Sequence, residues 1–347
     1  MERQVLDLWA QVLGCEAASI GIHDDFALCG GHSLAWVRLL AGIGRSFGCR
    51  PAAATFLTAQ TIAQQAAILR SDAKPTAPEI VVPLRPVAQA KAAPLFLVHG
   101  AAGTVSAYGE LARRLDPSVP VHGLQAPEAD DPTATIITRT LPELAALHVT
   151  AVRRVQQRGP YALAGWSLGG VLAFEMARQL RQAGEEVALL CLIDSHSPAQ
   201  LSRLDQYLGT SLPQAFLRDL FGLDLPATAS ADADIVAIIL AQPGLAGRVQ
   251  PEDAPRLRHL YALYCAHNDA LMAYEPTPID IPVTLLRAEA SIGAGDCGWG
   301  GLTPAGLTIE TVPGDHATLL QPPNLDVCAQ YLDAALARRP TTALVSG

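Results

Sequence analysis

The sequence lacks three features that mark common classes of protein. Its seven cysteines form no CxxC pair, its longest apolar runs, such as residues 187–193, are far too short to span a bilayer, and its 24 basic residues are outnumbered by 33 acidic ones. The cysteine pattern predicts no metal site, no disulfide framework and a reducing, cytoplasmic setting. The net charge of -9 argues against a nucleic acid or an anionic membrane as partner. The charged start, MERQVLDLWAQ, predicts a helix rather than a signal peptide.

A polar, proline-rich stretch, residues 71–78, divides the chain into a short helical part and a longer part. In residues 1–70, apolar residues recur at helical spacing and predict a small all-α bundle of three or four helices. The first helix ends at Gly14, the second begins at Ser33, and another covers residues 61–69. The second helix is expected to bury one side, made of Leu34, Val37, Leu40 and Ile43.

Residues 79–340 alternate between predicted strands and helices. Apolar runs typical of buried parallel strands cover residues 95–98, 161–164, 187–193, 283–286 and 307–312. The helices expected between and after them cover residues 141–157, 168–183 and 324–338. This alternation predicts an α/β domain with a mostly parallel sheet and helices on both faces. The mainly helical residues from about 199 to 278 interrupt the pattern, and we expect them to form a lid over the site.

A serine flanked by glycines lies between a predicted strand and a predicted helix, in Gly165-Trp166-Ser167-Leu168-Gly169. This pattern is the nucleophile elbow of α/β-hydrolases, whose acid and histidine follow the serine in that order. Asp194 closes the next strand, and His316 follows the last one. Because the carboxyl ends of parallel strands meet at one edge of the sheet, the three side chains should converge. The prediction is Ser167 as nucleophile, His316 as general base and Asp194 as the group that fixes the histidine tautomer.

An oxyanion hole needs two backbone N–H groups close to the nucleophile. One should belong to Leu168, directly after the serine, and the other to Ala101 in the loop His99-Gly100-Ala101-Ala102-Gly103.

Other residues compete for these roles. Asp269 and Asp296 are alternatives to Asp194. Among the histidines, the ring of His99 is expected to be structural within the oxyanion loop, and the ring of His196 to point away from the site. His259 and His267 lie in the expected lid and could be surface residues. Cys191, on a predicted strand, is interpreted as a core residue.

Ser33 has two interpretations. In Gly30-Gly31-His32-Ser33-Leu34 it is a good N-cap for the helix that follows. The positive end of that helix would also favour a phosphodiester on the serine. Physical reasoning from the residues leaves both open.

Residues 1–70 resemble the peptidyl carrier domain of nonribosomal peptide synthetases. The matching segments are Asp25-Phe26, Gly30-Gly31-His32-Ser33-Leu34 and Thr61-Ile62-Ala63, with Cys29 where these carriers usually have leucine. Residues 79–338 resemble the type I thioesterase domain that ends such synthetases. Here the matches are the HGAAG loop, GWSLGG, the Leu-Ile-Asp-Ser strand end and the Gly-Asp-His segment followed by Leu319-Leu320.

The resemblance implies a four-helix carrier bundle whose Ser33 bears 4′-phosphopantetheine, added by a separate phosphopantetheinyl transferase. It also implies a monomer that serves upstream condensation and adenylation modules. An acyl or peptidyl thioester on the carrier would pass to Ser167 and be released by water or by a nucleophile within the product, as an acid or a macrocycle.

Two alternatives remain at this point. One is a stand-alone serine esterase or editing thioesterase, whose helical N-terminal domain is no carrier. The other is a carrier or interaction module with a decayed hydrolase domain. The resemblance fits both the end of a longer synthetase and a separate small protein.

Overall fold

The computed structural model describes most of residues 1–338, and the predicted linker at 71–78 lies outside the described residues. The positions not described are 27, 32, 49–55, 57–58, 71–79, 88–89, 91, 209–210, 224–233, 243–244, 246–248, 250 and 339–347. Within the described part, no helix has both the length and the apolar composition that crossing a membrane requires.

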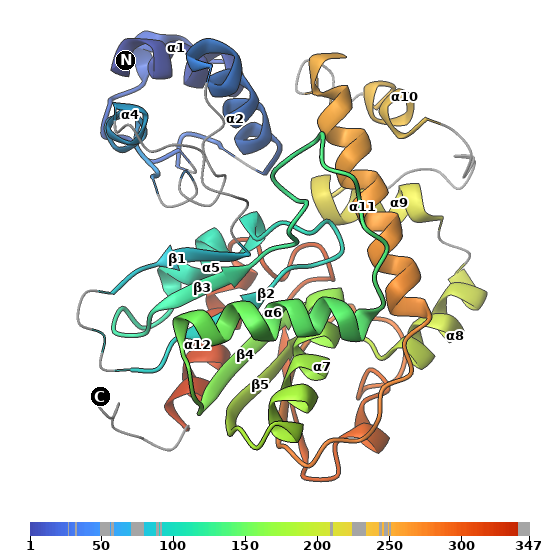
Figure 1. Ribbon diagram of the computed structural model, residues 1–347. Coiled ribbons are helices and arrows are strands. Elements are labelled where there is room, and N and C mark those ends of the chain that lie inside the picture. Colours follow the sequence, from blue (N-terminus) through green and yellow to red (C-terminus); the bar gives the residue numbers. More distant parts are fainter. Residues whose placement is uncertain are drawn as a thin grey trace.

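The N-terminal residues form a helical bundle (Figure 1), whose buried side chains, such as Val5 and Leu39, belong to the same apolar cluster as Leu95 and Leu97 of the following domain. The described elements of the bundle are α1 (Glu2–Leu13), a short 3-10 helix (Ala17–Ser19), α2 (Ser33–Phe47) and α4 (Ile62–Arg70). Gly14 ends α1 in the left-handed conformation, with φ 69°. The Trp9 indole is buried and donates to Gln65 Oε1 at 2.8 Å. These residues give three α-helices, and a four-helix bundle stays a prediction.

Of the four residues expected on the buried side of α2, the side chains of Leu34 and Val37 lie outside the described part, and Leu40 and Ile43 differ in burial. Ile43 is buried, together with Ala35, Trp36 and Leu39, which the sequence analysis did not select. Leu40 is only half-buried, because it faces the second domain and lines a cavity described below. A helix that packs against both its own bundle and a neighbouring domain has two apolar sides, and these blur a single helical periodicity.

Within the described residues, seven strands form one sheet, in the order β1-β3-β2-β4-β5-β6-β7. Their bounds are Val81–Arg85 (β1), Leu95–Val98 (β2), Val121–Leu124 (β3), Tyr161–Trp166 (β4), Val187–Ile193 (β5), Val283–Ala288 (β6) and Leu307–Val312 (β7). Only β1 runs antiparallel to its neighbour. The mostly parallel sheet predicted from the sequence is therefore confirmed, and β1 and β3 are strands that the sequence analysis did not identify.

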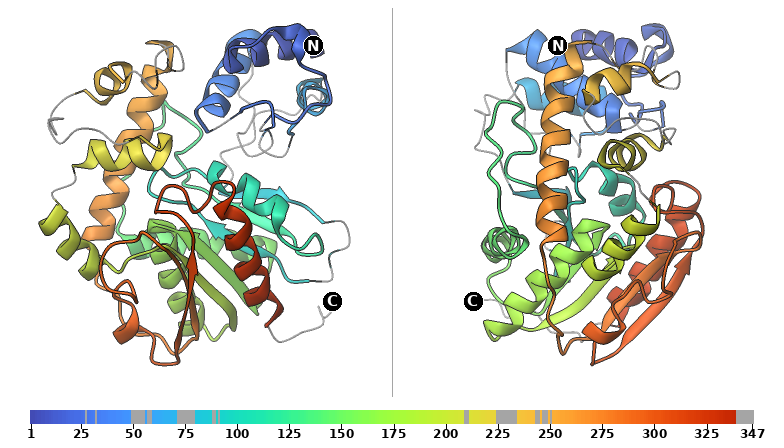
Figure 2. Two further views of the ribbon diagram at one scale, coloured as in Figure 1. Left: turned by 180° about the vertical axis from the view of Figure 1, so that it is seen from behind. Right: turned by 90° about the vertical axis from the view of Figure 1, so that its right-hand side faces the viewer.

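Helices cover both faces of this sheet (Figures 1 and 2). One face carries α6 (Leu141–Val155) and α7 (Leu168–Gln182), and the other carries α5 (Gly109–Arg114) and α12 (Asn324–Ala337). Strand β2 shows the consequence, because Phe96 and Val98 join the apolar cluster under α6 and α7 while Leu95 and Leu97 join the cluster under α12. Burial on both faces explains why the strands are continuous apolar runs.

We call residues 198–272, between β5 and β6, the insertion, and its described residues form four α-helices. They are α8 (Pro198–Leu208), α9 (Leu212–Phe221), α10 (Ile235–Leu240) and α11 (Ala254–Met272), with a 3-10 turn at Pro251–Asp253. The long helix α11 rises beside the sheet toward the N-terminal bundle (Figure 1). Aromatic rings join α9 to α11, since Phe216 contacts Tyr261 and Tyr264 edge-on at 5.2 and 5.3 Å. Two further 3-10 turns lie at Ser106–Tyr108 and Gly300–Leu302.

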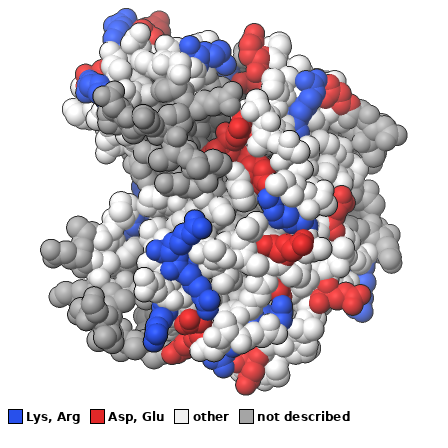
Figure 3. All heavy atoms as spheres, viewed as in Figure 1, with Lys and Arg blue, Asp and Glu red and all other residues white. Residues whose placement is uncertain are grey.

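The helical bundle lies against the insertion through α2 and α9. An ion pair supports this contact: Arg38 Nε lies 3.5 Å from Asp253 Oδ2, and the two side chains are only 11% and 4% exposed. On the face drawn in Figure 3, acidic side chains lie between the bundle and the insertion, and basic side chains occur in short groups among acidic ones.

Candidate active site

Ser167 lies at a sharp turn between β4 and α7. Its φ of 59° and ψ of -128° are unusual for a residue with a side chain, as the elbow geometry requires. The helix can start this close to the sheet only because glycines stand two residues before and two residues after the serine. A Cβ on Gly169 would lie 2.2 Å from the Val98 carbonyl oxygen, and one on Gly165 would lie 2.2 Å from the Gly169 carbonyl carbon.

Asp194 and His316 are in direct contact. Asp194 follows β5 directly, is fully buried and has a positive φ of 42°. Its Oδ1 accepts from the Ala288 N–H at 2.9 Å, and its Oδ2 accepts from His316 Nδ1 at 2.7 Å. Because Nδ1 donates to the carboxylate, Nε2 is left as the ring atom that can take up a proton.

The contact shifts the pKa of both groups. Burial alone would raise the pKa of Asp194, but the hydrogen bond and charge of His316 and the Ala288 N–H outweigh it and lower that pKa to about 2. Burial would lower the pKa of His316, but the Asp194 hydrogen bond and the negative charges of Asp219 and Asp194 raise it above the usual 6.5. Asp219 belongs to α9, so the insertion contributes to the electrostatics of this histidine.

Ser167 lies beside this pair. Its N–H donates to the carbonyl of Ile193, the residue before Asp194, at 3.0 Å. The ring of Trp166 stacks on the His316 ring with centroids 4.9 Å apart, and its Nε1 donates to the His316 carbonyl at 3.1 Å. In the described part of the chain, the Ser167 hydroxyl makes no hydrogen bond with His316 in this conformation. The structure thus joins Asp194 and His316 directly and puts Ser167 next to them.

The two backbone groups selected for the oxyanion hole also lie at this edge of the sheet. Leu168 is the first residue of α7, so its N–H has no acceptor four residues earlier in the helix. Ala101 lies in the loop after β2, and this loop approaches the elbow closely, because a Cβ on Gly100 would lie 3.3 Å from the Trp166 ring.

The two competing acids are placed differently from Asp194. Both carboxylate oxygens of Asp296 accept backbone N–H groups, from Gly298 at 2.9 Å and from Gly300 at 3.1 Å. Asp269 lies near the C-terminus of α11 and lines a separate cavity beside α6 and α7. Cys191 is buried in the core, and burial raises the pKa of its thiol well above the usual value, as befits a packing residue.

The competing histidines, His99, His196, His259 and His267, are held by backbone carbonyls. The His196 ring bonds to the Ile292 carbonyl at 3.0 Å, and the His99 ring to the Gly100 carbonyl at 2.7 Å. His259 and His267 are buried, so the interpretation of these two as surface residues is wrong. Their spacing was the missed signal: His259, Leu263 and His267 recur every four residues and share one face of α11.

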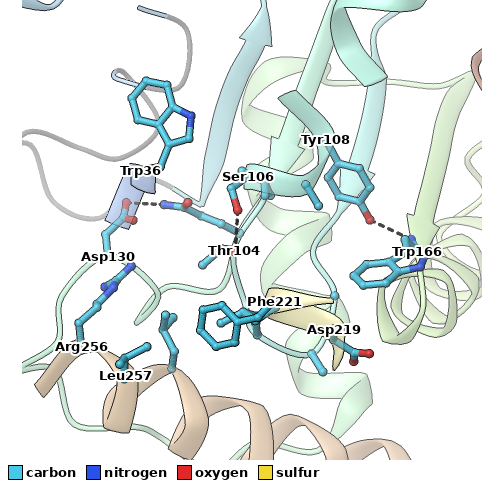
Figure 4. Close-up of a pocket in the computed structure, with 18 of the residues that line it drawn as sticks. Trp36, Thr104, Ser106, Tyr108, Asp130, Trp166, Asp219, Phe221, Arg256 and Leu257 are labelled. Atoms are coloured by element: carbon cyan, nitrogen blue, oxygen red, sulfur yellow. Dashed lines mark hydrogen bonds between the residues drawn. The ribbon is translucent and has the colours of Figure 1, made fainter. Parts of the chain in front are cut away.

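A cavity of about 90 Å³ lies between the helical bundle, the insertion and the loop after β2 (Figure 4). It reaches Ala101 and Trp166, although Ser167 and His316 do not line it. Trp36 and Leu40 of α2 close one side, and Phe221 points into its centre. The charged residues in its wall are Asp130, Asp219 and Arg256.

The parallel sheet, the strained serine at the strand–helix turn and the Asp–His pair define an α/β-hydrolase. Residues 93–336 match the family described as thioesterase domain, and the chain belongs to this family. Residues 3–69 match the family described as phosphopantetheine attachment site.

The similar proteins include nonribosomal peptide synthetases and a thioesterase domain. A probable non-canonical nonribosomal peptide synthetase, CymA from Salinispora arenicola, is 30% identical over 98% of this chain, which spans 4% of the length of CymA. Among solved structures, the four-domain synthetase holo-AB3403 covers 96% of this chain with a TM-score of 0.66 and 28% identity, and this chain covers 26% of it. The NocB thioesterase domain covers 72% of this chain with a TM-score of 0.52 and 29% identity, and 96% of that domain is matched.

Proposed function

We propose that this chain releases a finished acyl or peptidyl group from a carrier thioester, with Ser167, His316 and Asp194 as its catalytic residues. One observation supports this most strongly. The strained serine and the Asp194–His316 pair share one edge of the sheet, in a chain whose residues 3–69 match a phosphopantetheine attachment domain.

In the first step, His316 Nε2 takes the proton of the Ser167 hydroxyl as the oxygen attacks the thioester carbonyl. Asp194 holds Nδ1–H and stabilises the imidazolium that forms. The carbon–sulfur bond then breaks, the leaving sulfur receives the proton from His316, and the acyl group remains on Ser167 as an ester.

The Ala101 and Leu168 N–H groups would hold the negative oxygen of the tetrahedral intermediate in both steps. In the second step, His316 deprotonates water or a hydroxyl or amine of the product itself. That nucleophile displaces Ser167 and regenerates its hydroxyl, which gives an acid, a macrolactone or a macrolactam.

The helical bundle suits the cofactor that its family carries. Ser33 is the first residue of the 15-residue helix α2 and follows a turn in which Gly30 has φ 93°, so a phosphodiester there would meet the positive end of a long helix. When attached, phosphopantetheine supplies the thiol that carries the acyl group. We propose residues 1–70 as a four-helix carrier domain, 71–78 as a linker, and 79–340 as the thioesterase domain with a lid at about 199–278.

The position of α2 supports a hand-over between the domains. Trp36 and Leu40 lie one and two helical turns after Ser33, and both line the cavity that reaches Ala101. We propose that upstream condensation and adenylation modules supply the chain and that a phosphopantetheinyl transferase modifies Ser33, in keeping with the synthetases to which this chain is similar.

Incubation with a phosphopantetheinyl transferase and coenzyme A tests the carrier role. We expect a mass gain of one phosphopantetheine arm, which Ser33→Ala should abolish. A wild type that gains no mass would favour the stand-alone esterase. Loading with an acyl-coenzyme A then tests release: the Ser167→Ala variant should keep the acyl group on Ser33, and wild type should free it. A fluorophosphonate probe that fails to label wild type would favour a decayed hydrolase.

A further inference from the structure

The loop that carries Ala101 is bonded to the insertion. His267 of α11 is 3% exposed, and its Nδ1 lies 2.8 Å from the Ala101 carbonyl oxygen. A carbonyl only accepts hydrogen bonds, so Nδ1 of His267 must carry the proton and donate it. A helix of the insertion therefore holds one of the two peptide groups that flank the Cα of Ala101.

The other flanking peptide is held by the loop itself. The Gly100 carbonyl accepts from His99 Nδ1 at 2.7 Å and from the Gly103 N–H at 2.9 Å. This carbonyl and the Ala101 N–H belong to the same planar peptide unit, so fixing the oxygen also fixes the direction of the N–H. The bond from His267 to the Ala101 carbonyl links this loop to the insertion.

The two imidazole rings stack on each other and stay neutral. The His99 and His267 centroids are 5.0 Å apart with the planes at 29°. Burial lowers the pKa of both rings, so near neutral pH the stack carries no like-charge repulsion.

The loop and α11 are also packed tightly at Gly103. This residue has φ 79°, and a Cβ on it would lie 2.6 Å from Leu263 Cδ2 and 3.4 Å from His267 Cε1. A shift of α11 toward or away from the sheet would therefore displace the loop, through the packing at Gly103 and through the His267 hydrogen bond.

We infer that His267 is a positioning residue that couples the insertion to the oxyanion hole. The Ala101 N–H points at the developing oxyanion only while α11 is packed against the loop and His267 donates its hydrogen bond to the Ala101 carbonyl. This inference rests on the proposed function, because it assumes that Ala101 stabilises an oxyanion. It predicts that loss of the bond lowers kcat rather than substrate binding, since the N–H matters most when the oxygen is charged.

The test compares His267→Leu with His267→Asn on a soluble acyl thioester. Loss of an oxyanion donor typically costs about 10²–10³ in kcat, and a misdirected donor should cost less, about 10- to 100-fold. We expect that loss in His267→Leu with KM changed less than about threefold. Asn can present its Nδ2 where His presents Nδ1, so His267→Asn should recover most of kcat. The rate of fluorophosphonate labelling of Ser167 should follow kcat.

His259 provides a matched control on the same helix. It is buried two turns before His267, and its Nε2 bonds to the Glu128 carbonyl at 2.7 Å, outside the oxyanion loop. His259→Leu should leave kcat within about threefold of wild type. Equal losses in the two Leu variants, or no loss in His267→Leu, would overturn the inference. Thermal melting identifies a variant that fails to fold, and His267→Met, which fills similar space without a donor, then replaces His267→Leu.

The proposed function fails in a different way. A wild type that neither hydrolyses the thioester nor reacts with the probe would contradict the function. A wild type that does both, with His267→Leu equally active, would contradict only the role of His267.

Discussion

Asp194→Asn should inactivate the enzyme by forcing the wrong tautomer on His316. The Ala288 N–H donates to Asp194 Oδ1 at 2.9 Å, so an asparagine must keep its carbonyl oxygen at that position. Its NH₂ group then faces His316 Nδ1, which at present donates to Oδ2 at 2.7 Å. Two donors cannot bond to each other, so the ring proton must move to Nε2. In that form the ring cannot accept the proton of Ser167.

The charge of Asp194 accounts for one part of the effect. The pKa of Asp194 falls from 3.8 to about 2 in the folded protein, which corresponds to about 2.5 kcal/mol of stabilisation between the carboxylate and its surroundings. Loss of that charge alone would slow formation of the His316 imidazolium by up to about 60-fold. The tautomer change adds to this, and the corresponding replacement in a Ser-His-Asp protease lowers kcat by about 10⁴. We expect a loss of about 10³–10⁴.

Single-turnover hydrolysis of a soluble acyl thioester measures this loss, with thermal melting to check the fold. Asp296→Asn is the control, because the Asp296 carboxylate accepts from the Gly298 and Gly300 N–H groups, whereas His316 donates to Asp194. It should leave the rate within about twofold. A folded Asp194→Asn variant that loses less than about 60-fold would refute the reasoning.

Three further predictions concern pH, packing and docking. We propose the neutral ring of His316 as the base, and its pKa is raised, so the rate should rise with pH through a midpoint above 6.5. Asp219→Asn removes a negative charge that raises this pKa and should move the midpoint lower in a pH–rate profile. Gly169→Ala should largely unfold the domain in a melting experiment, because the added Cβ would lie 2.2 Å from the Val98 carbonyl oxygen of β2. Gly295→Ala is the control: the space around this residue is open, so its free energy of unfolding should change by less than about 0.5 kcal/mol. Arg38→Met removes one partner of the buried Arg38–Asp253 ion pair between the bundle and the insertion. It should slow acyl transfer from the loaded bundle to Ser167, measured by rapid quench, while the rate of hydrolysis of a soluble thioester stays within about twofold of wild type.

Much of the sheet could be predicted because its central strands are buried on both faces. A continuous apolar run such as residues 187–193 leaves few alternatives, and β5 has these bounds in the structure. The two strands that were missed have weaker patterns. Pro83 interrupts β1, which pairs only with β3 at the edge of the sheet, where a missing N–H is tolerated. The four residues of β3 include a histidine and a glycine.

The candidate site could be predicted as far as chain order determines it. Asp194 and His316 follow strands, and parallel strands bring their carboxyl ends to one edge, so their contact needed no further information. The bond between His267 and Ala101 joins residues 166 positions apart and depends on how α11 lies on the sheet domain. The half-buried position of Leu40 likewise depends on how the bundle meets the insertion. No local pattern encodes these arrangements.

The place of Trp36 in the cavity wall has a mechanical consequence. Ser33 and Trp36 belong to one rigid helix, so any motion that carries the attachment residue away from the sheet domain also withdraws the indole that closes the cavity. In the proposed hand-over, departure of the empty carrier would open the cavity beside Ala101 and Trp166, and arrival of the next loaded carrier would narrow it again. On the proposed function, the size of this cavity would therefore change twice in every turnover.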